Sequence, residues 1–299
     1  MRVLISGSTG FIGTALVARL SELGHEPVRL VRNTDPGDFT SVRWDPAAGT
    51  IDDGALDDVD AIVHLAGESI ASSRWTDAQK ARIMDSRVQG TSTLATAMAN
   101  ADAPPSVFLS GSAIGYYGDA GETRLDETGP AADDFAAQVT VRWEEEAAPI
   151  ATDATRLAYL RTGIVLDPSG GALKEQLPFF KLGLGGRIGK GTQWFSWISL
   201  ADEVNAIIHL LDADVEGPVN LTAPNPVTNA EFTKALGAVL GRPTLLPTPK
   251  PALWLRLGRE LSKTQLEGGA HISPTVLERS GFEFVDPELE PALRRMLTR

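Results

Sequence analysis

The chain opens with an apolar segment, a glycine-rich turn and an amphipathic helical pattern, in that order. Residues 2–6 have the apolar, β-branched character of a buried strand, and apolar side chains then recur at helical spacing over 11–23. Between the two segments, Gly7, Gly10 and Gly13 follow a G-x-x-G-x-x-G spacing. Glycines at this point let the backbone of a helix N-terminus approach a pyrophosphate closely. The pattern therefore predicts a dinucleotide site, although the same glycines would also suit a turn without a ligand.

Strands and helices continue to alternate after this turn. The expected strands cover 27–31, 60–65, 107–110 and 155–165, and the expected helices cover 76–101 and 135–150. Such alternation is typical of a parallel sheet. We therefore predict an α/β fold, a doubly wound Rossmann-like parallel sheet with helices on both faces and a small C-terminal lobe on the substrate side.

The sequence changes character after residue 166. A turn at 167–171, a glycine-rich stretch and an aromatic cluster predict a substrate-side loop over about 167–198. The expected helices beyond it cover 201–211, 229–240, 252–261 and a short segment between Ser273 and Gly281. We predict an NAD(P)-binding Rossmann domain over 1–240 and a small C-terminal domain over 241–299.

Composition limits the classes of partner. The 299 residues carry 39 acidic and 27 basic side chains, a net charge of −12, so we expect no nucleic-acid partner. No apolar run approaches the about 20 residues of a membrane-spanning helix, and no signal-peptide pattern is present, so we expect a cytoplasmic protein without a membrane partner. The chain has no cysteine and its four histidines are isolated, so we expect no metal. The oligomeric state stays open.

The end of the second expected strand bears on the choice of dinucleotide. An NAD site places an acidic residue about 20 residues after the glycines to bind the ribose hydroxyls. This chain has Arg32 and Asn33 there instead. Because an arginine can pair with a 2′-phosphate, the sequence favours NADP (NADPH). Arg32 as a solvated charge at a strand end is the alternative.

Several motifs together carry a resemblance to a known family. They are the glycine turn, His64–Glu68, Arg74–Thr76, Ser86–Arg87, Ser110–Gly118 and Arg161–Leu166. With them the chain resembles the extended short-chain dehydrogenase/reductases. The stretches Trp194–Ile198 and Gly281–Phe284 are similar to an atypical subfamily, the "epimerase family proteins", which are nucleoside-diphosphate-sugar epimerase-like and have a short C-terminal domain. The resemblance covers essentially the whole chain.

The resemblance implies a set of cofactor-binding residues. The glycine turn would hold the pyrophosphate, Arg32 the 2′-phosphate, and the segment after residue 64 would pass beside the adenine-side ribose and phosphates. Arg87 would touch a cofactor phosphate or a neighbouring acidic residue. The full set is Gly7, Ser8, Thr9, Gly10, Phe11, Ile12, Gly13, Arg32, Leu65, Ala66, Gly67, Glu68, Arg87 and Ser110.

The catalytic residues of the superfamily are only partly present. The resemblance implies that Ser112 hydrogen-bonds a substrate carbonyl or hydroxyl, with a turn-forming role as the alternative. The superfamily's Tyr-x-x-x-Lys pair, in which lysine lowers the phenol pKa, occurs nowhere in this chain. Tyr116 and Tyr117 are candidate substitute acids, and Glu68 and Lys80 are further candidates. Each of these has a structural alternative, since the tyrosines would also suit half-buried packing positions.

The sequence therefore supports more than one function. The first is an NADP-binding oxidoreductase or epimerase-like protein acting on a small molecule, such as a nucleotide-sugar or another anionic carbonyl compound. Arg187, Lys190 and the tryptophans of the substrate-side loop suit such a ligand. A non-catalytic NADPH-binding or sensing protein is one alternative. A nucleotide-sugar epimerase or dehydratase with a substitute acid/base is another.

Overall fold

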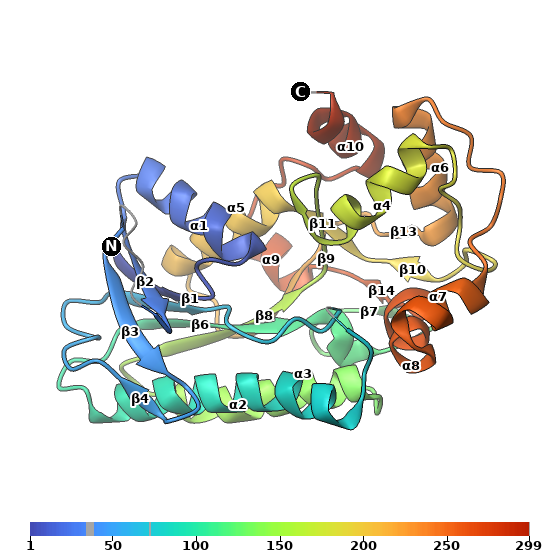
Figure 1. The fold of residues 1–299 in the computed structure, drawn as a ribbon. Coiled ribbons are helices and arrows are strands. Elements are labelled where there is room, and N and C mark those ends of the chain that lie inside the picture. The colour runs from blue at the N-terminus through green and yellow to red at the C-terminus, as the bar shows by residue number, and fades with distance from the viewer. Residues whose placement is uncertain (34–38, 72, 299) are drawn as a thin grey trace.

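The computed structural model describes residues 1–299 except 34–38, 72 and 299, and is built on an eight-stranded sheet (Figure 1). The described pairings of this sheet are parallel, except that β3 and β4 pair antiparallel. Across the sheet the strands are β12 (Gly217–Leu221), β8 (Arg156–Thr162), β6 (Val107–Ala113), β5 (Ala61–His64), β1 (Arg2–Ser6), β2 (Glu26–Val31), β3 (Ser41–Asp45) and β4 (Thr50–Ile51).

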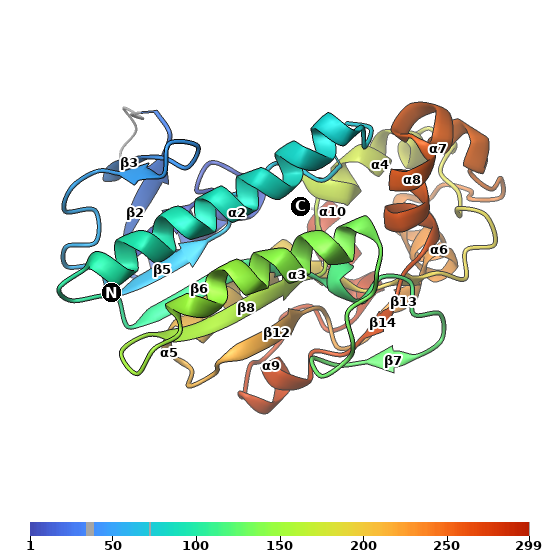
Figure 2. The same cartoon turned by 90° about the horizontal axis from the view of Figure 1, so that it is seen from below.

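Helices cover both faces of this sheet. On one face α1 (Phe11–Glu22) packs beside α5 (Leu200–Asp212), and on the other α2 (Asp77–Asn100) packs beside α3 (Phe135–Ala147) (Figures 1 and 2). A separate apolar core lies between the sheet and each helix layer, and the buried strands contribute side chains to both cores. The doubly wound Rossmann-like fold expected from the sequence is confirmed.

Strand β1 lies between β2 and β5, so the strand order reverses beside β1. The chain runs from β1 to β2, β3 and β4 on one side and then crosses back to β5 on the other side of β1. In sheets of this kind, ligands bind in the crevice where the strand order reverses, beyond the carboxyl ends of the strands. The segments after Ser6 and after His64 border that crevice.

A smaller lobe lies beyond the carboxyl ends of the strands (Figure 1). Its core combines apolar side chains from both sides of residue 240, including Phe180, Phe232 and Leu293. Its helices are α4 (Gly171–Lys181), α6 (Asn229–Leu240), α7 (Lys250–Leu257), α8 (Arg259–Ser262) and α10 (Leu289–Leu297). Short strand pairs accompany it: β9 (Ile164–Asp167) with β11 (Trp197–Ser199), β10 (Trp194–Phe195) with β13 (Val227–Thr228), and β7 (Arg124–Leu125) with β14 (His271–Ile272).

Short helical segments complete the described secondary structure. They are η1 (Ile114–Tyr117), η2 (Ala148–Ile150), η3 (Lys263–Glu267) and α9 (Thr275–Arg279). Among the described residues, no helix combines the length and apolar character needed to cross a bilayer.

Several elements differ from the sequence expectations. Residues 171–181 form α4 although a loop was expected, because its glycine start and internal Pro178 hide the helical spacing of Leu173, Leu177 and Phe180. The helix expected over 252–261 is broken at Gly258, whose φ is 86°. The strand expected over 155–165 divides at Gly163 into β8 and β9. Strands β3, β4 and β12 and helix α10 were not expected from the sequence.

Candidate functional site

The glycine turn packs backbone to backbone against the segment that follows β5. Gly7 has a φ of 68°, and a Cβ there would lie 2.8 Å from the carbonyl carbon of Leu65. A Cβ on Gly13 would overlap the carbonyl oxygen of Gly7 and lie 2.8 Å from Cα of Ser8. The N-cap residue Gly10 offers no side chain to the first backbone N–H groups of α1. These groups at a helix N-terminus form a cradle that fits a pyrophosphate.

Arg87 supplies a positive charge beside the second loop of the crevice. A Cβ on Gly67 would lie 3.1 Å from its Cζ, and its Nη1 donates to the carbonyl oxygens of Glu68 (2.9 Å) and Ile83 (3.0 Å). Its guanidinium also lies over the Trp143 ring, 4.8 Å from the centroid.

The charge of Arg87 is poorly compensated within the protein. Burial lowers the pKa of its guanidinium to about 10, and Glu68 only partly opposes this shift. Within the part of the chain that the structure describes, no carboxylate oxygen lies within 4 Å of its nitrogens. A partly buried cation without a close carboxylate is stabilised by an anionic ligand. A dinucleotide phosphate fits this requirement.

The buried side chain of His64 connects the end of β1, before the glycine turn, to the segment that follows β5. Nδ1 of His64 lies 2.6 Å from Oγ of Ser6, which also accepts a hydrogen bond from the backbone N–H of Ala66 (3.2 Å). Nε2 of His64 lies 3.1 Å from Oγ1 of Thr91. Burial and the nearby Arg87 lower the His64 pKa to about 3, so the ring is neutral. His64 therefore fixes the geometry of the loops without carrying charge.

Two arginines border the glycine turn on the β2 side. Nε of Arg29, on β2, donates to Oγ of Ser8 over 3.4 Å. Arg32 is exposed immediately after β2 ends at Val31. The sequence interpretation selected Arg32 alone, and the available signal for the second cation was Arg29, two residues before the end of β2.

The carboxyl end of β6 places its two serines in different surroundings. Ser110 is fully buried and donates to the carbonyl oxygen of Gly111 over 3.3 Å. Ser112 donates to Oε1 of Glu144 over 2.7 Å. Glu144 lies on α3. Sequence reasoning did not select Glu144, although the acidic run 144–146 on that helix was the available signal.

Arg161 on β8 holds Glu144 from two directions. Its Nε donates to Oε1 (2.8 Å) and its Nη2 to Oε2 (2.9 Å), a bidentate ion pair that raises the Arg161 pKa. Its Nη1 donates to the phenol oxygen of Tyr117 (2.9 Å), and its Cζ lies 3.5 Å from the centroid of the Tyr116 ring. The structure thus brings Ser112, Tyr116 and Tyr117 together around one buried guanidinium.

The two tyrosines differ in what their phenol groups contact. The Tyr117 hydroxyl donates to Oδ1 of Asn220 over 2.8 Å while accepting from Arg161. Burial raises the Tyr117 pKa to about 12. The hydroxyl proton of Tyr117 is therefore held in a hydrogen bond within the protein. Tyr116 is half-buried, and its ring supports the guanidinium.

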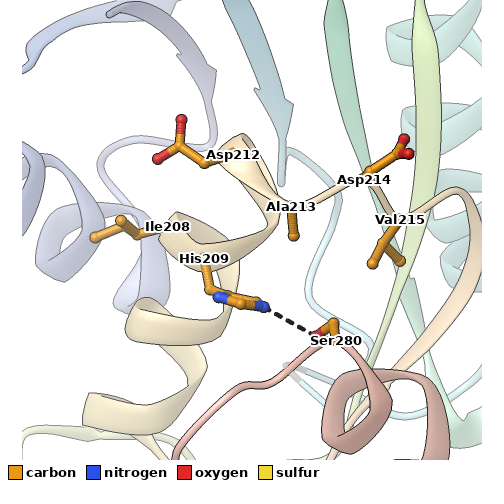
Figure 3. Close-up of a pocket in the computed structure, with 7 residues that line it drawn as sticks. All are labelled: Ile208, His209, Asp212, Ala213, Asp214, Val215 and Ser280. Carbon is orange, nitrogen blue, oxygen red and sulfur yellow. Dashed lines mark hydrogen bonds between the residues drawn. The ribbon is translucent and has the colours of Figure 1, made fainter.

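Outside the crevice, a pocket of about 450 Å³ lies between the end of α5 and Ser280, at the amino end of β12 (Figure 3). Because β12 is parallel to β1 within the sheet, this pocket lies at the edge opposite the glycine turn. Nε2 of His209 lies 2.9 Å from Oγ of Ser280, which donates to the carbonyl oxygen of Leu277. The serine proton is thus used in capping α9, which does not suit a nucleophile.

Comparison with known proteins agrees with this geometry. Residues 3–140 match the NAD dependent epimerase/dehydratase family, and residues 248–296 match a domain of unknown function. An epimerase family protein of Mycobacterium bovis is 42% identical over 298 residues, covering 99% of this chain and 98% of the relative.

This chain belongs to the epimerase family of atypical extended short-chain dehydrogenase/reductases.

Solved structures of family members superpose along the whole chain. The crystal structure of human epimerase family protein SDR39U1 with NADPH has a TM-score of 0.92 and 36% identity, covering 100% of this chain and 99% of that one. A nucleoside-diphosphate sugar epimerase from Corynebacterium glutamicum has a TM-score of 0.81 and 34% identity, covering 99% of this chain and 58% of that one. The family membership implied by the sequence motifs is confirmed.

Proposed function

We propose that this protein is an NADP(H)-dependent oxidoreductase or epimerase-like enzyme that uses an atypical acid/base group. The observation that carries this proposal is the hydrogen bond from Ser112 to Glu144, with Glu144 held by Arg161. A nicotinamide cofactor would supply or accept hydride. The glycine turn, Arg87, Arg29 and Arg32 would hold it.

The hydrogen-bond polarity of Ser112 suggests how a substrate would be handled. Its only hydroxyl proton is directed at Glu144, which leaves the lone pairs of its oxygen for a substrate hydroxyl. Ser112 would accept the substrate proton while its own proton moves to the Glu144 carboxylate. The reverse transfer would return the proton to a substrate carbonyl oxygen. This pair would replace the missing Tyr-x-x-x-Lys.

Ser112→Ala should separate turnover from cofactor binding. We expect turnover of a carbonyl substrate to fall by about 100-fold, the usual cost of losing one positioned hydrogen-bonding group. The NADPH dissociation constant should stay within about twofold, because Ser112 directs its proton at Glu144 rather than at the cofactor loops. Steady-state kinetics with a panel of sugar-nucleotide and smaller carbonyl substrates, together with NADPH fluorescence titration, measures both. Unchanged turnover would contradict the proposed role of Ser112.

The preference for NADPH over NADH is proposed from the two arginines near the glycine turn. Arg29→Gln and Arg32→Gln should each weaken NADPH binding by about tenfold, or ~1.4 kcal/mol, and leave NADH binding nearly unchanged. Arg19→Gln, on the exposed surface of α1, is the matched control for loss of one positive charge. Titration of each variant with both cofactors gives the comparison. Equal affinities of the native protein for NADPH and NADH would refute the preference.

The substrate class proposed is an anionic carbonyl or hydroxyl compound, with a nucleotide-sugar as the leading example. A relative 34% identical to this chain is described as a nucleoside-diphosphate sugar epimerase. Lys190 in the loop beyond α4 is available for an anionic group, whereas Arg187 donates to the carbonyl oxygens of Gly189 and Lys190. We place this activity in the cytoplasm.

A non-catalytic NADPH-binding protein is the second candidate. It is favoured by the commitment of the Tyr117 proton to Asn220 and by the lack of a Tyr-x-x-x-Lys pair. Tight NADPH binding with no oxidation of NADPH across the whole substrate panel would support this candidate over the enzyme. Substrate-dependent NADPH oxidation that Ser112→Ala abolishes would support the enzyme.

A further inference from the structure

Exposed apolar side chains are concentrated at one end of the small lobe. Eight large apolar side chains are strongly exposed among the described residues, and six of them belong to α4, α7 and the loops beside them. Four of these six are leucines in the loops that follow α4 and α6: Leu182 (73%), Leu184 (63%), Leu245 (87%) and Leu246 (71%). We call these four residues the leucine tip.

The two loops that carry the leucine tip are held side by side. The backbone N–H of Thr248 donates to the carbonyl oxygen of Arg187 (2.8 Å), and its hydroxyl donates to that of Gly186 (3.1 Å). A Cβ on Gly186 would overlap the carbonyl oxygen of Leu246. Both views show these segments at the end of the lobe farthest from β1 (Figures 1 and 2). The tip is therefore one continuous, outward-facing surface.

The charge around the leucine tip is opposite to that of the whole chain. Residues 171–191 and 229–268 contain ten Lys and Arg side chains and four Asp and Glu, a net charge of +6 in a chain of net −12. Three of those four acidic residues are paired with cations, and they are Glu175, Glu260 and Glu267. Lys181 and Arg242 directly precede the two leucine loops in sequence.

We propose that the leucine tip docks this protein on the surface of an anionic lipid bilayer. Leucines on protruding loops bury apolar area at the boundary between headgroups and acyl chains, while flanking cations attract anionic headgroups. Side chains exposed by 63 to 87% project outward, whereas a peptide groove encloses the side chains that line it, so this exposure favours a lipid surface over a peptide ligand. The chain lacks spanning and signal segments, but this mode of binding needs neither.

The experiment is co-sedimentation of the full-length protein with vesicles. Vesicles of phosphatidylcholine and phosphatidylglycerol should sediment the protein, phosphatidylcholine vesicles should not, and added salt should reduce binding. The double variant Leu245→Ser, Leu246→Ser should lower the vesicle partition coefficient by about tenfold or more, since each leucine contributes buried apolar area. Leu23→Ser is the matched control, because Leu23 is exposed at the end of α1.

Either of two results would overturn the proposal. One is no sedimentation of the native protein with phosphatidylglycerol vesicles, and the other is equal sedimentation of the double variant and the native protein. Circular dichroism and the melting temperature of each variant check that the fold is intact. The proposal does not depend on the proposed enzymatic function, because vesicle binding requires neither cofactor nor substrate.

Discussion

Replacing Gly13 by alanine should abolish tight NADPH binding. A Cβ at this position would overlap the carbonyl oxygen of Gly7 and lie within 2.8 Å of Cα of Ser8. Neither contact is with a flexible side chain, so the turn must move away from the N-terminus of α1. Displacing that cradle removes backbone N–H groups from the phosphates, and we expect a loss of about 100-fold in affinity, or ~2.7 kcal/mol.

The control for this variant is a second glycine-to-alanine substitution, at a position where the added methyl group would not clash with its neighbours. A Cβ on Gly115 would lie 3.4 Å from Cβ of Ala136, an ordinary contact, so Gly115→Ala should bind NADPH nearly as well as the native protein. Fluorescence titration well below the melting temperature compares the two, and circular dichroism verifies that both are folded. Native-like affinity in Gly13→Ala would show that the glycine turn does not hold the cofactor.

Replacing Glu203 by glutamine should stabilise the protein above neutral pH. Glu203 is fully buried on α5, Oγ1 of Thr162 donates to its Oε1 over 2.8 Å, and its Oε2 has no partner among the described residues. Burial raises its pKa to about 8 from an ordinary 4.5. The folded state therefore holds a proton that the unfolded state releases between these two values, and the free energy of unfolding falls as pH rises through this range.

Glutamine removes this pH dependence because it stays neutral with nearly the same shape. We expect similar melting temperatures for Glu203→Gln and the native protein near pH 4, below both pKa values. At pH 8.5 the variant should be more stable by a few kcal/mol, since each pKa unit corresponds to about 1.4 kcal/mol. Glu122→Gln, on the exposed surface, is the control and should leave the pH profile unchanged. Parallel pH profiles for native protein and Glu203→Gln would contradict a neutral buried Glu203.

Local sequence signals were sufficient for much of the framework. The strand, glycine turn and helix over 2–23 appear as β1 and α1, and the capping-box spacing at Thr228 marks the start of α6 at Asn229. Contacts between residues close in sequence define these elements, so their sequence patterns predict them without knowledge of the tertiary structure. Strand β12 lacks such a signal, because it exists only through pairing with the distant strand β8.

The candidate site was only partly accessible from sequence. Ser112 was selected from its motif, but its partner Glu144 is 32 residues away and Arg161 is a further 17 residues along the chain. Tyr117 was considered as an acid, whereas the fold gives it two hydrogen-bond partners and a pKa of about 12. These properties depend on burial and on neighbours from other elements, which no local pattern encodes.

The sequence by itself determined the doubly wound α/β framework, the steric need for glycine at the crevice and the family of the chain. Those features follow from local periodicity, backbone conformation and motif spacing, which act over a few residues at a time. Only the tertiary structure decided that Glu144 and Arg161 surround Ser112, that Glu203 is sealed from water, and that two leucine loops share one surface. Each of these depends on segments distant in sequence meeting in space, because parallel pairing and lobe packing set which side chains lose contact with water.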